Sequence, residues 1–435
     1  MQQPTSPSAP HPSAPSLGSG ASASGAGSAG TPAQESRTPD SGSSALVRDS
    51  GASASGSGTP ALNSSTPASG SGAGSGAAWF GGWHARGLLE VSTDPAVLDG
   101  GGWWAVMITF EGECRFWRFA EVDAAPLPAA PAGDSDWHGP PVSAWSSSLD
   151  QAAYQSGVTE IRNRIRDGDV YQTNLCRVLT AGLPEVGSSD PWALARRLAT
   201  GNPAPYAGVI DVPESGGLES TRIVCASPEL FLERDGELVR SGPIKGTGAT
   251  EADLQPKDEA ENVMIVDLVR NDLQRVSRAG TVEVSALMRV ERHPGLVHLV
   301  STVEGRLRPA TSWPELLAAT LPAGSVSGAP KSSALRTIGD LEPVPRGPYC
   351  GAIGFVDADR QYARLAVGIR TFWWQGDNLC FGTGAGITWG SDPEREWAET
   401  ELKAARLIDL ASDHPRSGHP ADQVKSRATA ASRSK

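Results

Sequence analysis

An acid and an amine lie at the two ends of a predicted β-hairpin. The stretch "SPELFLERDGELVRSGPIKGTG" has short runs rich in Leu, Phe and Val on both sides of an Asp-Gly dipeptide (235–236), which is typical of a type I′ turn. Pairing outward from that turn places Glu229 opposite Gly242. Lys245 follows three residues later, a span of about 10 Å at full extension. The pattern therefore predicts a carboxyl group and a primary amine at the mouth of one hairpin. Such a pair is also compatible with a surface ion pair, which contributes little to stability.

A predicted helix places further carboxylates on an apolar face. In "KDEAENVMIVDLVRND" and the residues after it, apolar side chains recur at helical spacing: Val263, Val266, Val269, Leu273 and Val276. Asp258 lies eleven residues before Val269, which is three helical turns, so it falls on this stripe, and Glu261 borders it. Carboxylates on a helix usually occupy the opposite, solvated face.

The last predicted helix carries a second acidic pair. Ser391 and Glu394 have the S-x-x-E spacing of a capping box, with Pro393 in the first turn. Glu396 and Glu399 are three residues apart and share one face. Two such pairs on separate helices would supply the oxygen ligands that Mg²⁺ takes, with water completing its shell. Each pair is also compatible with a solvated helix face, and no spacing shows that the helices meet.

Two glycine-rich stretches resemble nucleotide-binding loops only superficially. "GTGAG" (382–386) lacks the third glycine of G-x-G-x-x-G and leads into "ITWG" rather than a helix. "GSVSGAPKSS", from Gly324, has the wrong spacing for a Walker A loop. Both stretches could present backbone N–H groups to an anion or serve as ordinary turns.

The elements that must position these residues alternate irregularly. Helix candidates are 257–276, 313–321, 329–339 and 393–412, and a further helical pattern ends at Asp167-Gly168-Asp169. Many antiparallel-looking strands separate them, such as "AGVIDV", "RIVCAS", "RLAVGIRTFWW" and "NLCFGTGAGI". This order predicts an α+β fold, a large sandwich of mainly antiparallel sheets with outer helices. A doubly wound nucleotide fold would require regular alternation.

Composition divides the chain into four parts. Residues 1–75 are almost wholly Ser, Gly, Ala, Pro and Thr and are expected to be disordered, because they cannot bury enough apolar surface to offset the entropy of ordering. A short β-rich region (76–149) precedes the core (150–413), which carries the charged residues above. Residues 414–435 return to polar low complexity, and we expect a second disordered tail.

Charge and cysteine content exclude several classes of protein. The net charge of −12, without a sustained Lys/Arg run, disfavours nucleic acid and anionic membrane as partners. The five cysteines are scattered and never form a C-x-x-C spacing, so neither a disulfide framework nor a zinc site is predicted. No signal-peptide pattern and no run of about 18 apolar residues occurs, so we expect a soluble, cytoplasmic protein.

A series of motifs resembles the chorismate-utilising enzymes. Their order along the chain matches the family over about residues 150–410: "DGDVYQTNL", "PIKGT", "KDEAENVMIVDLVRNDLQRV", "VHLVSTVEG", "GSVSGAPK", "RGPYCGAIG", "GIRT", "GAGI" and "SDPEREWAETELKA". The family includes anthranilate synthase component I, aminodeoxychorismate synthase component I and isochorismate synthase. The resemblance implies the chorismate-utilising fold, chorismate as substrate and Mg²⁺ as cofactor.

The residue at position 245 separates subgroups of this family. The lysine in "PIKGT" is similar to aminodeoxychorismate synthase component I, whereas anthranilate and isochorismate synthases typically carry alanine there. The resemblance implies that Lys245 attacks C2 of chorismate while the C4 hydroxyl leaves, protonated by Glu229, and that ammonia then adds at C4 and expels the lysine. A free lysine has a pKa near 10.4, so an apolar cleft would have to lower it. A dry environment would likewise keep the proton on Glu229.

Other positions carry implied roles. The resemblance assigns Glu261 and Glu399 to Mg²⁺, with Asp258 and Glu396 behind them or bridged by water, and His298 to catalysis. It assigns the remaining positions to substrate binding: Thr247, Ser325, Gly328, Tyr349, Arg370, Ala385, Gly386 and Lys403. A guanidinium suits a planar carboxylate, and His298 is also compatible with a structural role.

The resemblance also bears on partners. No cysteine lies in a G-x-C-x-G elbow, so ammonia is expected from a separate glutamine amidotransferase subunit, in a heterodimer that serves folate and 4-aminobenzoate synthesis. An anthranilate synthase component I that carries lysine is the main alternative. A catalytically silent scaffold is disfavoured, because the charged site residues are all present.

Overall fold

The computed structural model describes residues 74–130, 137–184, 190–248, 250–253, 256–293 and 296–413, although not the side chains of Thr247 and Asp258. The two predicted tails lie outside these residues, except that strand β1 already begins at Gly74. Within the described ranges, no helix has both the length and the apolar character needed to cross a bilayer.

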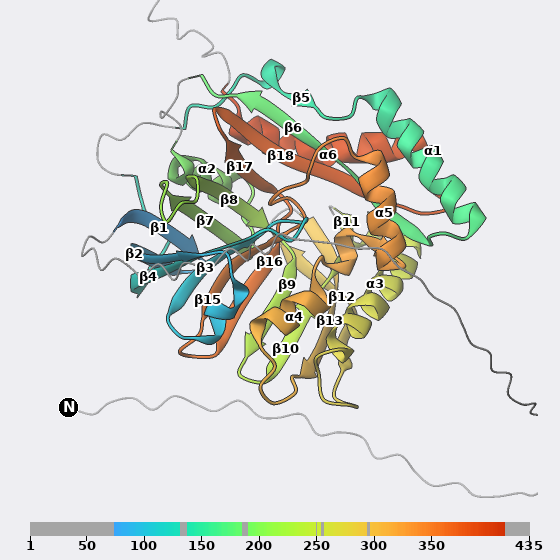
Figure 1. Cartoon of the computed structure of the whole chain (residues 1–435). Coiled ribbons are helices and arrows are strands. Elements are labelled where there is room, and N and C mark those ends of the chain that lie inside the picture. Colours follow the sequence, from blue (N-terminus) through green and yellow to red (C-terminus); the bar gives the residue numbers. More distant parts are fainter. Residues whose placement is uncertain are drawn as a thin grey trace, which may run out of the picture. The chain divides into compact units, whose positions relative to one another are not determined.

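The described residues contain eighteen strands joined by hydrogen bonds into one network (Figure 1). The strands are β1 (Gly74–Phe80), β2 (Trp83–Ser92), β3 (Trp103–Ile108), β4 (Cys114–Ala124), β5 (Ser146–Ser147), β6 (Gln172–Gly182), β7 (Tyr206–Val212), β8 (Thr221–Ser227), β9 (Leu230–Asp235), β10 (Leu238–Gly242), β11 (Ile244–Gly248), β12 (Glu283–His293), β13 (Leu296–Arg306), β14 (Gly328–Ala329), β15 (Ala352–Asp357), β16 (Tyr362–Val367), β17 (Thr371–Gln375) and β18 (Asn378–Ile387).

The strands form one long antiparallel ladder. Neighbour by neighbour it runs β12, β13, β10, β9, β16, β15, β3, β4, β2, β1, β7, β8, β17, β18, β6. β11 continues beside β10 along β13, and β14 and β5 add to β6. β1 to β4, from the predicted N-terminal β-rich region, therefore lie in the middle of the ladder. They connect two arms, one that runs from β12 to β15 and one that runs from β7 to β6. Twisted sheets of this size curl rather than stay open.

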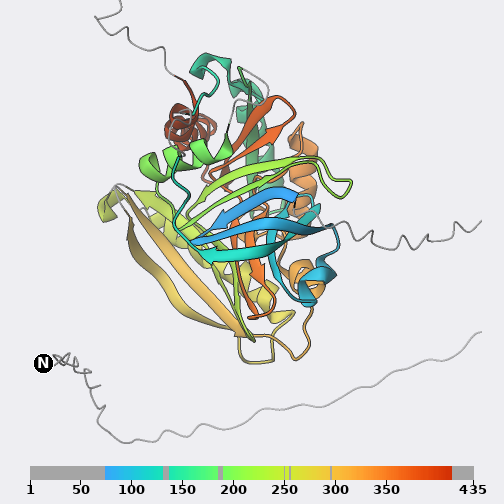
Figure 2. The ribbon, with the colours of Figure 1, turned by 90° about the vertical axis from the view of Figure 1, so that its left-hand side faces the viewer.

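Helices cover the outside of both arms. They are α1 (Gln151–Asp167), α2 (Pro191–Gly201), α3 (Pro256–Gln274), α4 (Trp313–Thr320), α5 (Lys331–Leu341) and α6 (Pro393–Ala411), with short 3₁₀ turns that include η4 (Gly324–Val326). α6 packs on β18, α2 on β8, and α3 on β11 and β13. Figure 2 shows β12 and β13 (gold) at the lower end of the fold and α6 (dark red) at the upper end. The predicted architecture of antiparallel sheets with outer helices is confirmed.

Apolar residues explain this arrangement. The β3 sequence "WWAVMI" is buried at every position, which is the pattern of a strand covered on both faces. Trp104 and Trp117 are among the largest fully buried side chains. α1 ends at Gly168, whose φ of +87° is a left-handed cap, as the Asp-Gly-Asp pattern predicts.

Four local predictions are wrong. In the β9–β10 hairpin, Asp235 pairs with Leu238, so the loop is Gly236-Glu237 and the register differs from the predicted one. Gly236 has φ +59° at the first loop position, as a type II′ turn requires. A bulge then pairs Gly242 with Leu230, so Glu229 precedes the strand. Gly236 therefore occupies the first loop position of a type II′ turn, and not the second position of the type I′ turn that Asp235-Gly236 predicted.

The other three errors concern a strand, a cap and a helix face. "RLAVGIRTFWW" is two strands, β16 and β17, because Arg370 between them adopts φ +52°. The α6 N-cap is Asp392, whose carboxylate accepts from the Arg395 amide at 3.1 Å, so Ser391 and Glu394 form no capping box. Val263 is 50% exposed, and the buried face of α3 carries Ile265 instead. α2 was not predicted, although Asp190 and Pro191 form a typical helix start.

Candidate active site

Glu229, Ser325 and Lys245 come together between the two arms of the ladder. Glu229 is only 4% exposed. Ser325, in η4, hydrogen-bonds the Glu229 carboxyl with its side chain, and its carbonyl accepts from Lys245 Nζ at 3.3 Å. Burial raises the pKa of Glu229, while the Ser325 hydrogen bond, the Lys245 charge and the Ile244 backbone amide offset part of that increase. The site therefore joins a carboxyl group of raised pKa to a primary amine.

A β-bulge directs Lys245 into this place. On β11, Ile244 pairs with Val300 and Thr247 pairs with His298, so Lys245 and Gly246 together oppose one residue of β13. Gly246 adopts φ +79°, which glycine tolerates without strain. A bulge kinks its strand and re-aims the side chain there.

Helix α3 supports the strand opposite this bulge. Asn262, 1% exposed, donates through Nδ2 to the Leu299 carbonyl at 3.3 Å and accepts from Ser301 Oγ at 2.5 Å. Leu299 is the residue that faces the bulge on β13. These two hydrogen bonds fix α3 to β13 at Asn262, the residue that follows Glu261.

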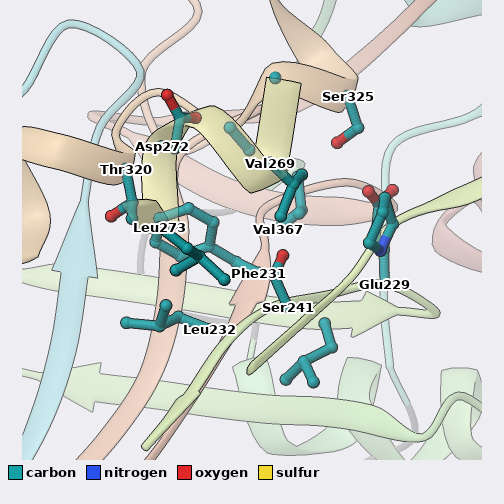
Figure 3. Close-up of a pocket in the computed structure, with 14 residues that line it drawn as sticks. Glu229, Phe231, Leu232, Ser241, Val269, Asp272, Leu273, Thr320, Ser325 and Val367 are labelled. Carbon is teal, nitrogen blue, oxygen red and sulfur yellow. The ribbon is translucent and has the colours of Figure 1, made fainter. Parts of the chain in front are cut away.

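A small pocket lies directly behind Glu229 (Figure 3). Its free space is about 20 Å³, room for about one water molecule, so it is too small for a ring substrate. Figure 3 shows Glu229 and Ser325 at one side and Asp272 and Thr320 at the other, with apolar side chains such as Val269 between them. The pocket therefore leaves the Glu229 carboxyl mostly surrounded by protein atoms.

Arg370 brings a cation to the junction of β16 and β17. Burial alone lowers its pKa, and no acidic group among the described residues offsets that effect. Its backbone is held at φ +52°, and its carbonyl accepts from the Ala226 amide at 3.0 Å. A partly buried guanidinium without a described acidic partner is suited to an anionic ligand.

The side chain of Tyr349 is buried inside the fold and is not exposed on its surface. It is 5% exposed, and burial raises the pKa of its phenol well above the ordinary value, next to the buried Cys176. A Cβ at Gly382 would lie 2.0 Å from its ring, so the ring occupies the space that this glycine leaves open. The nearby Arg346 is 1% exposed and bonds Glu342 through two nitrogens.

The remaining predicted positions lie on strands β11, β13, β14 and β18 and on helix α6. Ala385 and Gly386 are on β18, and Gly328 on β14 pairs with Thr173. Lys403 of α6 donates to the Gly384 carbonyl at 3.1 Å and pairs with Glu399 at 2.8 Å. His298 on β13 is 1% exposed. The side chain of Thr247 lies outside the described residues, although its backbone pairs with His298.

The acidic residues have the right chemistry for Mg²⁺ but are not gathered into a large cluster. Within the described part, no three His, Cys, Asp or Glu side chains form a group that could hold a metal ion. Glu396 is 7% exposed, Glu399 pairs with Lys403, and the side chain of Asp258 is not described. A magnesium ion here would take one or two carboxylates from the protein and complete its octahedral shell with water and substrate, which is its usual coordination.

Comparison with known proteins identifies the family. A model of the family described as chorismate binding enzyme matches residues 119–409. The chain belongs to the chorismate-binding enzymes. A relative from Haloarcula marismortui, anthranilate synthase component 1 1, is 38% identical over 342 residues, 75% of this chain and 66% of the relative. Aminodeoxychorismate synthase component 1 of Klebsiella aerogenes is 36% identical over 280 residues, 61% of this chain and 59% of the relative.

Solved structures of chorismate-binding enzymes share the fold. Anthranilate synthase component I from Streptococcus pneumoniae matches with a TM-score of 0.60 at 27% identity, over 71% of this chain and 80% of that chain. A putative 2,3-dihydroxybenzoate-specific isochorismate synthase from Bacillus anthracis matches with a TM-score of 0.66 at 24% identity, over 77% and 96%. The chain spans between about half and two thirds of the length of the first curated relatives it matches.

Sequence analysis of this chorismate-binding enzyme missed two amides on β6. Asn174, 9% exposed, donates from Nδ2 to the Ser325 carbonyl at 3.3 Å, the same oxygen that accepts from Lys245. Gln172, two residues earlier, is fully buried. The available signal was Gln-x-Asn on a strand followed by apolar residues, which places both amides on one face.

Proposed function

We propose that this chorismate-binding enzyme is component I of an aminodeoxychorismate synthase, which converts chorismate and ammonia to 4-amino-4-deoxychorismate. The observation that carries the proposal is the Lys245 amine, held by the Ser325 carbonyl beside the buried carboxyl of Glu229. A subgroup in which this position is alanine has no nucleophile there.

The proposed reaction has two displacements. The Lys245 amine forms a bond to C2 of the ring as the double bond shifts and the C4–oxygen bond breaks, and Glu229 gives its proton so that water leaves. Ammonia then bonds to C4, the double bond shifts back, the C2–nitrogen bond breaks to release the neutral lysine, and the new C4 ammonium group returns one proton to the Glu229 carboxylate. Glu229 needs a raised pKa to hold its proton until the hydroxyl departs, and its burial raises that pKa.

Charged groups would position the dianionic substrate. Arg370, between β16 and β17, and Lys403, on α6, are the cations proposed for this role, and either can pair with a carboxylate. Mg²⁺ is part of the proposal, with Glu261 and Glu399 as its protein ligands. When bound, the ion would neutralise the ring carboxylate, which the net charge of −12 otherwise repels. Ammonia would come from a glutamine amidotransferase subunit.

A product assay tests the proposal. The purified chain is incubated with chorismate, Mg²⁺ and ammonium, and the products are separated by chromatography and identified by mass spectrometry. We expect aminodeoxychorismate, which becomes 4-aminobenzoate only after a lyase is added. Anthranilate, which is fluorescent, would support the second candidate, anthranilate synthase component I. That candidate is favoured by identities of 37–40% to relatives named anthranilate synthase component 1, against 32–36% to relatives named aminodeoxychorismate synthase component 1.

The lysine itself is tested by trapping. Without ammonia, intact-protein mass spectrometry should detect an adduct equal to chorismate minus one water on the wild-type chain. Lys245→Ala should lose this adduct and aminodeoxychorismate formation, while the thermal shift caused by chorismate with Mg²⁺ persists. Lys245→Arg keeps a cation without a comparable nucleophile and should behave in the same way. Wild-type turnover in Lys245→Ala would exclude the nucleophile.

A further inference from the structure

Arg346 is a buried cation that joins strand β6 to the η4 turn. Its side chain is 1% exposed, and Nε and Nη2 donate to the two carboxylate oxygens of Glu342 at 2.7 and 2.6 Å. Nη1 donates to the Val326 carbonyl at 2.8 Å, and Nη2 also donates to the Asn174 carbonyl at 3.2 Å. Glu342 in turn accepts from the Cys176 amide at 2.9 Å. One guanidinium therefore fixes β6 and η4 to the same point.

Both carbonyls belong to residues next to the Lys245 amine. Val326 follows Ser325, whose carbonyl accepts from Lys245 Nζ at 3.3 Å. The Asn174 side chain donates to that same Ser325 carbonyl, also at 3.3 Å. Because peptide units are planar, a fixed Val326 carbonyl restricts the rotation of the preceding unit, which contains the Ser325 carbonyl. The guanidinium therefore controls the group that orients the amine.

The turn between β3 and β4 holds Arg346 from outside. The Glu111 carboxylate accepts from the backbone amides of Arg346 at 2.8 Å and Gly347 at 3.2 Å. The Phe110 amide donates to the Gly347 carbonyl at 2.9 Å, and the guanidinium carbon of Arg346 lies 4.1 Å from the centre of the Phe110 ring. Such a cation–π contact stabilises a desolvated guanidinium. This turn of the N-terminal β-rich region thus fixes both the backbone and the side chain of Arg346.

We propose that Glu111 is a positioning residue for the Lys245 amine and that it acts through Arg346. Glu111 fixes the backbone from which the guanidinium reaches the two carbonyls, and these carbonyls set the Ser325 carbonyl that orients the amine. The inference rests on the proposed function, because it concerns the alignment of Lys245 with the chorismate ring. Small displacements of a reacting group are costly for the rate. Glu111 is exposed, so it adds little to the apolar core.

Glu111→Ala separates rate from binding. Without ammonia, the chorismate adduct on the full chain should form about fivefold more slowly, because the amine is less well aligned. Quenched time points and intact-protein mass spectrometry measure this rate. The thermal shift caused by chorismate with Mg²⁺ should stay at the wild-type value, because the change removes no substrate contact.

Glu113→Ala is the matched control. Glu113 is exposed on the same turn, and it contacts Thr109 through its backbone: its amide donates to Thr109 Oγ1 at 3.0 Å, and its carbonyl accepts from the Thr109 amide at 2.9 Å. The variant removes the same charge from the same turn and should form the adduct at the wild-type rate. The comparison separates the contact with Arg346 from a change in surface charge.

Arg346→Lys tests the route. Lysine keeps a positive charge beside Glu342, but its single nitrogen cannot reproduce the fork that bonds the carboxylate and both carbonyls. This variant should form the adduct more slowly than Glu111→Ala. Residues that act as one unit are not additive, so the double variant should be no slower than Arg346→Lys alone. If Arg346→Lys does not fold, the comparison of Glu111→Ala with Glu113→Ala still decides the inference.

The outcomes are distinct. Slower adduct formation in Glu111→Ala, with wild-type rates in Glu113→Ala and an unchanged chorismate-induced shift in both, supports the inference. Wild-type adduct formation in Glu111→Ala would overturn it, and so would an equal loss of rate in the two alanine variants. Independent losses that multiply in the double variant would also overturn it, because Glu111 would then act without Arg346.

These outcomes differ from a failure of the proposed function. If the wild-type chain binds chorismate but forms no adduct on Lys245, the proposed function fails together with the inference. If the wild-type chain forms the adduct and Glu111→Ala forms it equally fast, only the inference fails.

Discussion

At the scale of single residues, the site depends on the carboxyl group of Glu229, whose burial disfavours the ionised form. Glu229 lines the small pocket, and burial is the largest cause of its raised pKa. Lys245 and Ser325 oppose that increase without cancelling it. A side chain in this state is suited to donate a proton to a leaving hydroxyl group.

This state has a consequence for stability that Glu229→Gln tests. Because the folded-state pKa is raised, Glu229 binds its proton more tightly in the folded than in the unfolded chain, and wild-type stability falls as pH rises through the folded-state pKa. The glutamine variant cannot ionise. Its stability relative to wild type should therefore increase with pH, by about 1.4 kcal/mol for each unit between the two pKa values.

Denaturant unfolding of wild type and Glu229→Gln between pH 5 and pH 9 measures this difference. The two proteins should converge at the acidic end. A difference that is independent of pH, or that favours wild type increasingly at high pH, would show that the carboxyl is already ionised in the folded protein. Turnover of the variant should be strongly reduced throughout, since its amide cannot supply the proton.

At the scale of elements, the β11 bulge is the device that aims the lysine. Gly246, at φ +79°, allows two residues of β11 to oppose one residue of β13. Alanine at this φ costs about 1 kcal/mol relative to glycine. Relief of that strain would shift the bulge and with it the Lys245 side chain.

Gly246→Ala and Gly236→Ala form a matched pair. Gly236 has φ +59° in the β9–β10 turn, and a Cβ there would meet nothing within 4 Å. We expect each variant to lose about 1 kcal/mol of stability in denaturant unfolding. Only Gly246→Ala should lose turnover, by at least about tenfold, because small displacements of a reacting group are costly. Equal loss of turnover in both variants would contradict the role of the bulge.

At the scale of the whole molecule, the N-terminal strands hold the two arms together. β1 pairs with β2 on one side and β7 on the other, and β2 pairs with β4. Through these strands, the arm with β9 to β13 is continuous with the arm that carries β18 and β6. The site lies where the two arms meet, as the shared Ser325 carbonyl shows.

Deletion of β1 and β2 tests this connection. A chain that begins at residue 93 loses buried residues such as Phe80, Ala85 and Leu88, and it removes β2 from one side of β4 and β1 from one side of β7. Compared with a chain that begins at residue 74, it should lose its cooperative thermal transition in circular dichroism and its turnover. An unchanged melting temperature would show that the rest of the fold is stable without β1 and β2.

Motifs and periodicity were sufficient to predict much of this protein. The helices near 257–276, 313–321 and 393–412, most strands, the antiparallel architecture and the approach of Glu229 to Lys245 follow from local patterns. Those patterns are local because helical and strand periods, caps and turn glycines act over a few residues. The roles of the metal ligands, the Mg²⁺ requirement and the glutaminase partner remain predictions.

Only the tertiary structure decided what depends on contacts between distant segments. It set the β9–β10 register through the Gly236-Glu237 loop and a bulge, split the β16–β17 segment at Arg370, and exposed Val263 on α3. It also buried Gln172 against Gly386, more than two hundred residues away along the chain. No local period records which strand a side chain will face, because that depends on how the two arms of the ladder pack against each other.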